Sequence, residues 1–326
     1  MLQRKYIINN GSCHPLNSNN HQNIGVHFIE ISAAQENQRL DNFLLRYFKT
    51  VPKTRIYRII RKGEVRVNKK RCKPEYKLQP GDSLRIPPVT VETSSEAAPY
   101  LPEKLLDLIA HSILFENEHF LVINKPAGLA VHSGSGIAFG VIDLIRKMRP
   151  DDDIELAHRL DRDTSGCLML TKNRQVLLDM QKRWQDNSIR KIYLALVKGR
   201  WPDQLRKVEH RLIKTQLANG ERRVFVGENG KTATSLVKVL STSDSYTLIE
   251  VELLTGRTHQ IRVHCQAEGH EIAGDNKYGD PAFDKTMRQK GKKRLMLHAS
   301  SLHLPQSNYT AETRILAPLP EEFELV

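Results

Sequence analysis

Residues 158–166 read HRLDRDTSG and lie between two mainly apolar runs. An apolar run is what a buried strand requires, and Thr164-Ser165-Gly166 is typical of a tight connection, so we predict two buried strands joined there. Two carboxylates and two guanidiniums fall within residues 159–163. Such charges usually belong to a solvated turn. A carboxylate at the end of a buried strand is instead rigid and partly dehydrated, which makes Asp161 a candidate for chemistry.

The composition predicts a water-soluble chain with a polyanionic partner. The 326 residues favour two domains, and the hydrophobic fraction of 39% with a mean hydropathy of -0.47 is that of a globular protein. No run approaches the ~18 apolar residues of a membrane span, and the N-terminal apolar run is too short for a secretory signal. Lys plus Arg minus Asp plus Glu is 50 − 37 = +13, which favours nucleic acid as the partner.

Neither a disulfide framework nor a metal site is expected. The four cysteines are scattered and form no CxxC pair, which favours reduced thiols and a cytoplasmic location. His259 and His264 are five positions apart, outside the i, i+4 spacing of a helical metal pair. The acidic run at 151–153 follows Pro150 and is typical of a solvated loop.

The N-terminal part predicts a disordered leader and a small compact domain. Residues 1–22 are rich in Asn, Ser and His and lack apolar periodicity, so we expect them to be disordered. Residues 23–86 show apolar residues at helical spacing around 40–47, and again after Pro52 up to Gly63. Apolar and polar residues then alternate at 64–68, and a further strand is expected at 83–86.

Basic side chains lie on the exposed side of this small domain. A lone charged helix is usually only a solvated face, but here the basic side extends from the second helix into the following turn. Such a surface can neutralise the phosphates of RNA. The candidate RNA-binding residues are Lys53, Arg55, Arg58, Arg61, Lys62, Lys69, Lys70 and Arg71.

The remainder predicts a linker and one large α+β domain. Residues 87–102 are rich in Pro and Ser and are typical of an interdomain linker. In residues 103–326, strands dominate and often follow one another, which favours a mostly antiparallel mixed sheet. Helices are expected at 103–111, 139–149, 174–186 and 258–268. Strands are expected at 113–116, 120–124, 155–160, 167–171, 191–198, 234–240, 246–253, 295–303 and 309–316.

Three further stretches bear on chemistry. Residues 125–129 (KPAGL) follow a strand, and residues 191–197 (KIYLALV) carry Tyr193, which is either a core tyrosine or a ring against a substrate. In residues 253–264 (LLTGRTHQIRVH), a strand ends and a helix capped by Thr258 is expected to follow. His259, Arg262 and Gln266 would share one face of that helix as a pocket wall. The GxGxxxG pattern from Gly134 lacks the context of a dinucleotide-binding loop.

HRLDRDTSG, KPAGL and LLTGRTHQIRVH together resemble the motifs of the RluA-type pseudouridine synthases. RIYRIIRKGEVRVNKKR resembles an S4 RNA-binding domain, which precedes the catalytic domain in many of these enzymes. The resemblance implies that Asp161 is the catalytic residue, that Tyr193 lies against the target base and that Arg262 pairs with Asp161. It also implies that Arg159 fills the gap left in the RNA by the base.

Residues 51–89 resemble the subgroup of this family that acts on large-subunit (23S) ribosomal RNA. The isomerisation oxidises nothing and transfers no phosphate, so no cofactor is expected, and we expect a monomer. Two alternatives remain: a non-catalytic RNA-binding assembly factor with the same fold, and a hydrolase acting on a nucleoside or glycoside. A hydrolase would need a positioned water and usually a second acid.

Overall fold

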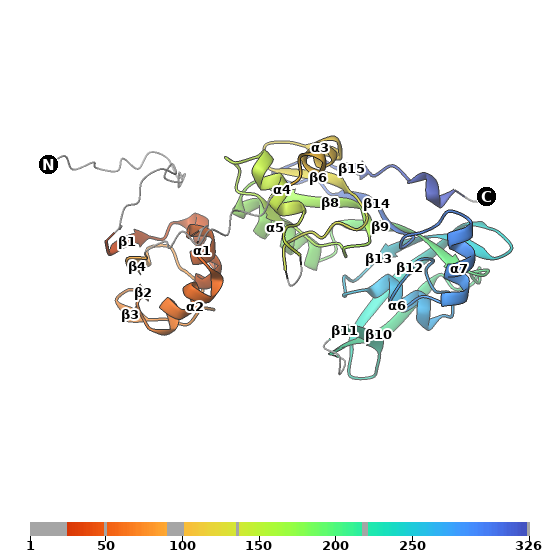
Figure 1. Cartoon of the computed structure of the whole chain (residues 1–326), viewed down its shortest axis with the longest axis horizontal. Coiled ribbons are helices and arrows are strands. Elements are labelled where there is room, and N and C mark those ends of the chain that lie inside the picture. Colours follow the sequence, from red (N-terminus) through yellow and green to blue (C-terminus); the bar gives the residue numbers. More distant parts are fainter. Residues whose placement is uncertain (1–24, 49–50, 90–100, 135–136, 217–220, 325–326) are drawn as a thin grey trace. The chain divides into compact units, whose positions relative to one another are not determined.

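The computed structural model divides the chain into two compact units, Met1–Ser95 and Glu96–Val326 (Figure 1). It describes residues 25–48, 51–89, 101–134, 137–216 and 221–324. The leader expected at 1–22 and residues 90–100 of the expected linker lie outside these ranges. Within them, no helix combines the length and the apolar character that crossing a membrane requires.

The N-terminal unit packs two helices against a small antiparallel sheet with strand order β1-β4-β2-β3. The second helix begins directly after Pro52 and ends before Gly63, whose φ is +71°, as the sequence predicts. Its apolar stripe, Ile56, Ile59 and Ile60, is buried. The elements are β1 (His27–Glu30), η1 (Ala33–Gln35), α1 (Leu40–Tyr47), α2 (Lys53–Arg61), β2 (Arg66–Val67), β3 (Lys70–Arg71) and β4 (Ser83–Ile86).

The C-terminal unit is built on an eleven-stranded sheet. Nine of its strands follow the order β11-β10-β12-β13-β9-β14-β8-β6-β5, and the other two, β15 and β7, pair with β14 and β8. Among the described strands of this unit, β14 and β8 form the one parallel pair, so the predicted α+β fold with a mostly antiparallel mixed sheet is confirmed. The strands are β5 (Ile113–Glu116), β6 (Phe120–Lys125), β7 (Glu155–Leu156), β8 (Ser165–Thr171), β9 (Arg190–Lys198), β10 (Lys207–Gln216), β11 (Arg222–Val226), β12 (Lys231–Thr242), β13 (Tyr246–Leu253), β14 (Leu297–Leu304) and β15 (Thr313–Leu316).

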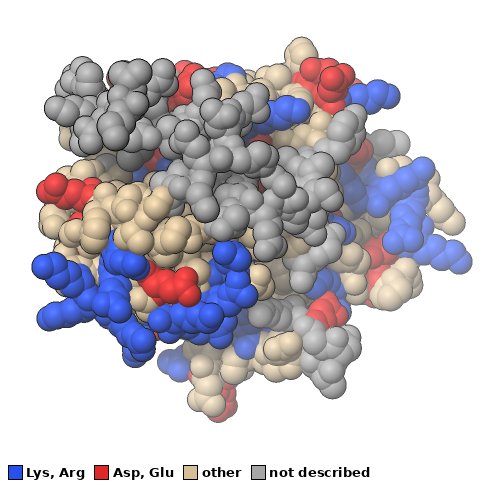
Figure 2. Space-filling view, turned by 60° about the vertical axis from the view of Figure 1, so that its left-hand side comes forward, with Lys and Arg blue, Asp and Glu red and all other residues tan. Residues whose placement is uncertain are grey.

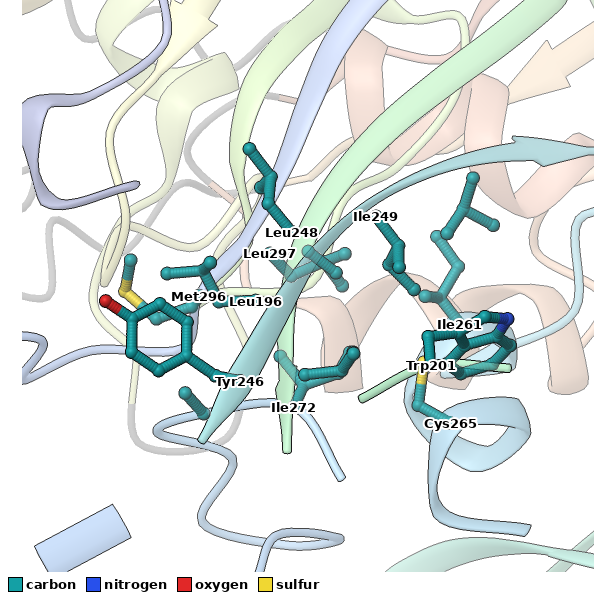
Figure 3. Packing of buried hydrophobic residues seen from close by; sticks show 14 of the residues in the cluster. Leu196, Trp201, Tyr246, Leu248, Ile249, Ile261, Cys265, Ile272, Met296 and Leu297 are labelled. Atoms are coloured by element: carbon teal, nitrogen blue, oxygen red, sulfur yellow. The ribbon is translucent and has the colours of Figure 1, made fainter. Parts of the chain in front are cut away.

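Helices cover both faces of the middle of this sheet. Side chains alternate along β8, so Leu168 packs into the core with α3 and α4, while Met169 packs into the core with α5. A third core lies between β9, β12 and β13 and the helices α6 and α7, where Ile261 and Cys265 meet Trp201 (Figure 3). The helices are α3 (Glu103–His111), α4 (Val141–Met148), α5 (Arg174–Gln185), α6 (Gln260–Ala267), α7 (Pro281–Gln289) and η2 (Glu321–Phe323).

The turn after Asp161 differs from the sequence prediction. The first strand stops at Leu156, and Ser165 and Gly166 already belong to β8. Gly166 has a φ of +107°, and a Cβ placed there would lie 2.2 Å from the carbonyl oxygen of Ala299 on β14. Only glycine therefore allows β8 and β14 to approach as a parallel pair. The motif glycine serves strand pairing rather than a turn.

Several element boundaries were also predicted wrongly. The strand expected at 309–316 begins at Thr313, and the helix expected at 258–268 begins at Gln260, with His259 rather than Thr258 at its N-cap. The strands β10 and β11 and the helix α7 were not predicted. Most of β10 is exposed, so it lacks a clear apolar alternation. For α7 a signal exists, because Asp280 caps the helix and Pro281 occupies its first turn.

Glu116 links three elements of the C-terminal unit, and this predicts a pH-dependent stability. The carboxylate of Glu116 accepts hydrogen bonds from Arg149 and forms an ion pair with Lys172. These two contacts lower the pKa of Glu116 to about 2. Glu116→Gln should therefore destabilise the unit by about 1–2 kcal/mol at pH 7, a range that allows for partial solvent screening. A carboxylate with a lowered pKa stabilises above its unfolded pKa, so the difference should shrink as pH falls from 4.5 towards 2.

Urea unfolding of both proteins between pH 7 and pH 3 measures this difference. The exposed Glu118 offers a matched control, and Glu118→Gln should change little at any pH. A loss for Glu116→Gln that stays constant down to pH 3 would show that the three-way contact contributes no charge-dependent stability.

Candidate active site

The loop that carries Asp161 is held by a buried lysine from the KPAGL stretch. The ammonium nitrogen of Lys125 donates to the carbonyl oxygens of Pro126 and Leu129, each at 2.8 Å, and to that of Arg162 at 2.9 Å. Lys125 is fully buried, and burial lowers its pKa to about 7 against the attraction of Asp163 and Asp161. KPAGL therefore positions the loop from outside it.

The start of the same loop is fixed by His158. Its Nε2 atom accepts a hydrogen bond from the backbone N–H of Met169 at 3.0 Å, and its ring stacks on Trp184 with 4.3 Å between centroids. Burial lowers the pKa of His158 to about 3, so the ring is neutral and able to accept this bond. The first residue of HRLDRDTSG is thus structural, and Asp161 projects from a loop anchored on both sides.

Arg262 on α6 connects two aspartates. Its guanidinium donates to both carboxylate oxygens of Asp275, at 2.7 and 2.6 Å, and its Nη1 lies 3.5 Å from Oδ2 of Asp161. The resemblance implies a pair of Arg262 with Asp161, and that contact is present. The shorter bidentate pair is with Asp275, which the sequence analysis missed.

Asp275 is the buried residue that holds the guanidinium of Arg262 in place. Its side chain is fully buried and also accepts hydrogen bonds from the backbone N–H groups of Lys277 and Tyr278. Burial raises its pKa, but Arg262 outweighs burial and holds the pKa of Asp275 below its usual range. Asp275 is therefore an ionised carboxylate that fixes the guanidinium, and Arg262 in turn keeps one N–H directed at Asp161.

His259 is a second neighbour of Asp161. Its Nε2 lies 3.6 Å from Oδ2 of Asp161, and its Nδ1 lies 2.8 Å from the hydroxyl oxygen of Tyr278. Its backbone is in the left-handed region, with φ 54° and ψ 22°, directly before α6. Burial lowers the pKa of His259, only partly offset by the charge of Asp161, so the ring is neutral at pH 7.

Tyr193 lies on β9 where two hydrophobic cores meet. It packs against the core beneath α6 and α7 and against the core beneath α3 and α4. The residue is half-buried, and burial together with the nearby charge of Asp161 raises its pKa. The hydroxyl therefore stays protonated at neutral pH. The fold thus brings together Asp161, Tyr193 and Arg262, which are far apart in the sequence.

Comparison with known proteins identifies the family. Residues 119–267 match the model of the RNA pseudouridylate synthase family, and residues 38–84 match the S4 domain. Ribosomal large subunit pseudouridine synthase C of Pasteurella multocida (strain Pm70) is 46% identical over 93% of this chain and 94% of its own length. The chain belongs to the RNA pseudouridine synthases. The family resemblance carried by its motifs is therefore confirmed.

Other relatives agree with this assignment. Ribosomal large subunit pseudouridine synthase C of Escherichia coli (strain K12) is 47% identical over 91% of this synthase and 94% of its own length. Among solved structures, human RNA pseudouridylate synthase domain containing 4 is 25% identical with a TM-score of 0.55, covering 68% of this chain and 93% of its own. The similarity to the bacterial relatives thus includes both units of this synthase.

The roles of three site residues, Lys125, Asp275 and Tyr278, were not predicted from the sequence. His259 was predicted to belong to the pocket wall, but its approach to Asp161 was not predicted. Asp275 follows Gly274, whose φ is +73° and where a Cβ would lie 2.0 Å from the carbonyl oxygen of Arg294. The sequence signal for Asp275 was the run Ala-Gly-Asp shortly after the helix. A single aspartate in a loop does not form a pattern that identifies a functional residue.

The basic residues of the S4 domain are mostly exposed. Figure 2, in which the side carrying this unit comes forward, shows Lys and Arg side chains crowded together with few acidic ones between them. Arg55 is half-buried, and the other seven candidates are exposed. In the catalytic unit of this synthase, Arg159 is also exposed, two residues before Asp161.

Proposed function

We propose that this synthase converts specific uridines of 23S ribosomal RNA into pseudouridine, with Asp161 as the catalytic carboxylate. The observation that carries the assignment of Asp161 is its position: it projects from an anchored loop, has two donors directed at one of its oxygens, and its charge acts on the hydroxyl of Tyr193. The choice of RNA rests on the two relatives named above, which span nearly the whole chain.

The reaction breaks the C1′–N1 bond, turns the uracil and joins C5 to C1′. The sugar passes through an electron-poor state at C1′, so an ionised carboxylate beside it assists, whether as nucleophile or as base. Tyr193 offers a flat ring on which the flipped uracil stacks, and its protonated hydroxyl can donate a hydrogen bond. Arg159, exposed at the rim, fills the gap that the flipped base leaves in the RNA.

A glycoside or nucleoside hydrolase is disfavoured by the surroundings of Asp161. A two-carboxylate mechanism needs a second acid that is free to exchange protons. Asp275 is fully buried and bound at both oxygens by Arg262, and Asp163 is paired with Arg162. A non-catalytic assembly factor would have no use for the oriented carboxylate. We expect the enzyme to act as a monomer in the cytoplasm.

Pseudouridine mapping tests the proposed function. Carbodiimide-stop sequencing of 23S ribosomal RNA from cells with and without this gene should reveal stops that vanish in the deletion strain. Those stops should return with the wild-type gene but not with the Asp161→Asn gene. An unchanged 23S pattern in the deletion strain, with altered stops in another RNA, would refute the substrate.

Charge reversal in the S4 domain should weaken RNA binding without affecting the chemistry. Arg58, Arg61 and Lys69 are exposed, and each phosphate contact contributes about one unit to the salt dependence of affinity. The triple glutamate variant should therefore bind an rRNA fragment more weakly, with a slope of log affinity against log salt reduced by about 2–3.

A salt series on the full-length proteins measures both quantities. A matched triple reversal of Lys104, Lys147 and Lys182, exposed lysines of the catalytic unit on α3, α4 and α5, serves as the control for net charge. Equal loss of affinity in both variants would show that the S4 surface makes no specific contribution. Deletion of residues 1–86 should reproduce the effect of the first variant.

A further inference from the structure

We propose that His259 is a positioning residue for Asp161, acting as a neutral Nε2–H donor whose tautomer is set by Tyr278. The inference rests on the proposed catalytic role of Asp161 and adds a second donor to Arg262. It also assigns the two carboxylate oxygens different tasks. Oδ2 is held by the protein, and Oδ1 faces the sugar.

The tautomer follows from a chain of hydrogen bonds. The backbone N–H of Val224 donates to the hydroxyl oxygen of Tyr278 at 3.0 Å, and that hydroxyl lies 2.8 Å from Nδ1 of His259. Tyr278 is buried, so its hydroxyl proton needs an acceptor, and Nδ1 is the one available along this chain. The hydroxyl therefore donates to Nδ1, and the ring proton of the neutral imidazole is on Nε2. The opposite tautomer would leave the hydroxyl proton unpaired and turn a lone pair towards a carboxylate.

The Nε2–H group points at the same oxygen that Arg262 holds. Nε2 of His259 lies 3.6 Å and Nη1 of Arg262 lies 3.5 Å from Oδ2 of Asp161. Among the residues that the structure describes, none donates a hydrogen bond to Oδ1. Two donors on one oxygen define the rotation of the carboxylate, and the contacts tighten when a substrate excludes water. The other oxygen remains available for C1′.

Tyr278 contacts both residues that donate to Asp161, Arg262 and His259. Its ring lies under the guanidinium of Arg262, with 5.1 Å from Cζ to the ring centroid, and edge-to-face against the ring of His259 at 5.4 Å. The left-handed backbone of His259 is costly for a residue other than glycine, and it brings the ring back over the loop of Asp161. His259 thus has a strained backbone and a partner at each ring nitrogen, as expected of a residue that holds Asp161 in position.

Three variants separate a positioning role of His259 from a packing role. The amide nitrogen of Gln reaches the place of Nε2, whereas that of Asn reaches only the place of Nδ1. We expect His259→Asn to lower kcat about 10- to 100-fold with KM and the melting temperature nearly unchanged, and His259→Gln to retain most of kcat. His270→Asn is the matched control, since His270 binds a carbonyl through Nδ1 outside the site, and it should leave kcat unchanged.

Nitrogen NMR of the imidazole rings reads the tautomer directly. The signal that His259→Asn removes should show a protonated Nε2 and an unprotonated Nδ1 in the wild type, and a mixture in Tyr278→Phe. Equal kcat for the Asn and Gln variants, or a protonated Nδ1 in the wild type, would overturn the inference. Asp161→Asn separates the two proposals, because an inactive Asp161→Asn with a fully active His259→Asn would refute only the role of His259.

Discussion

Asp161→Asn should abolish pseudouridine formation, lowering the rate by about 10⁴-fold or more, while the protein stays folded and still binds RNA. Asn has the shape of Asp and can still accept a hydrogen bond from Arg262 or His259. It has no charge to stabilise the sugar at C1′ and cannot act as nucleophile or base. The measurement is the release of tritium from C5 of labelled uridine in an rRNA fragment, under single-turnover conditions.

The neighbouring aspartate provides the control for this experiment. Asp163 lies in the same loop and pairs with the exposed Arg162, so Asp163→Asn should keep most of the activity. RNA affinity should be similar in the wild type and both variants. Substantial turnover by Asp161→Asn, or an equal loss in both variants, would contradict the assignment of Asp161 as the catalytic carboxylate.

The sequence predicted those parts of the fold that have a regular pattern. The buried helix stripe of α2 and the all-buried strand β8 follow from apolar spacing, and both were found. The strand β10 escaped because most of its side chains are exposed, which hides the period of two. The short β7 shows the opposite error, because apolar residues before Asp161 suggested a longer strand than hydrogen bonding forms.

The site was predictable to the extent that its residues lie in motifs. Asp161 and Arg262 lie in two of the motifs that resemble the family, and the same resemblance implies the role of Tyr193. Asp275 and Tyr278 have no local pattern, and their roles depend on α6 and the following loop folding back together. His259 was placed on a helix face, but its left-handed backbone lies outside the helix and turns the ring towards Asp161.

Arg262→Met should cause the largest combined loss, because this guanidinium serves both the fold and the site. Removing it leaves Asp275 fully buried and ionised without its partner, which is expected to cost about 3–5 kcal/mol of unfolding free energy. It also removes one of the two donors on Oδ2 of Asp161, so activity should fall severely. Urea unfolding and single-turnover rates measure the two effects separately.

A double variant distinguishes the two roles of Arg262. In Arg262→Met with Asp275→Asn, the new amide oxygen can still accept from the backbone N–H groups of Lys277 and Tyr278, and position 275 no longer carries a charge. Most of the lost stability should return in this double variant, whereas activity should stay low because Asp161 still lacks its donor. Activity that returns together with stability would mean that Arg262 acts only through the fold. A stable but inactive double variant places the effect of Arg262 on the carboxylate of Asp161 itself.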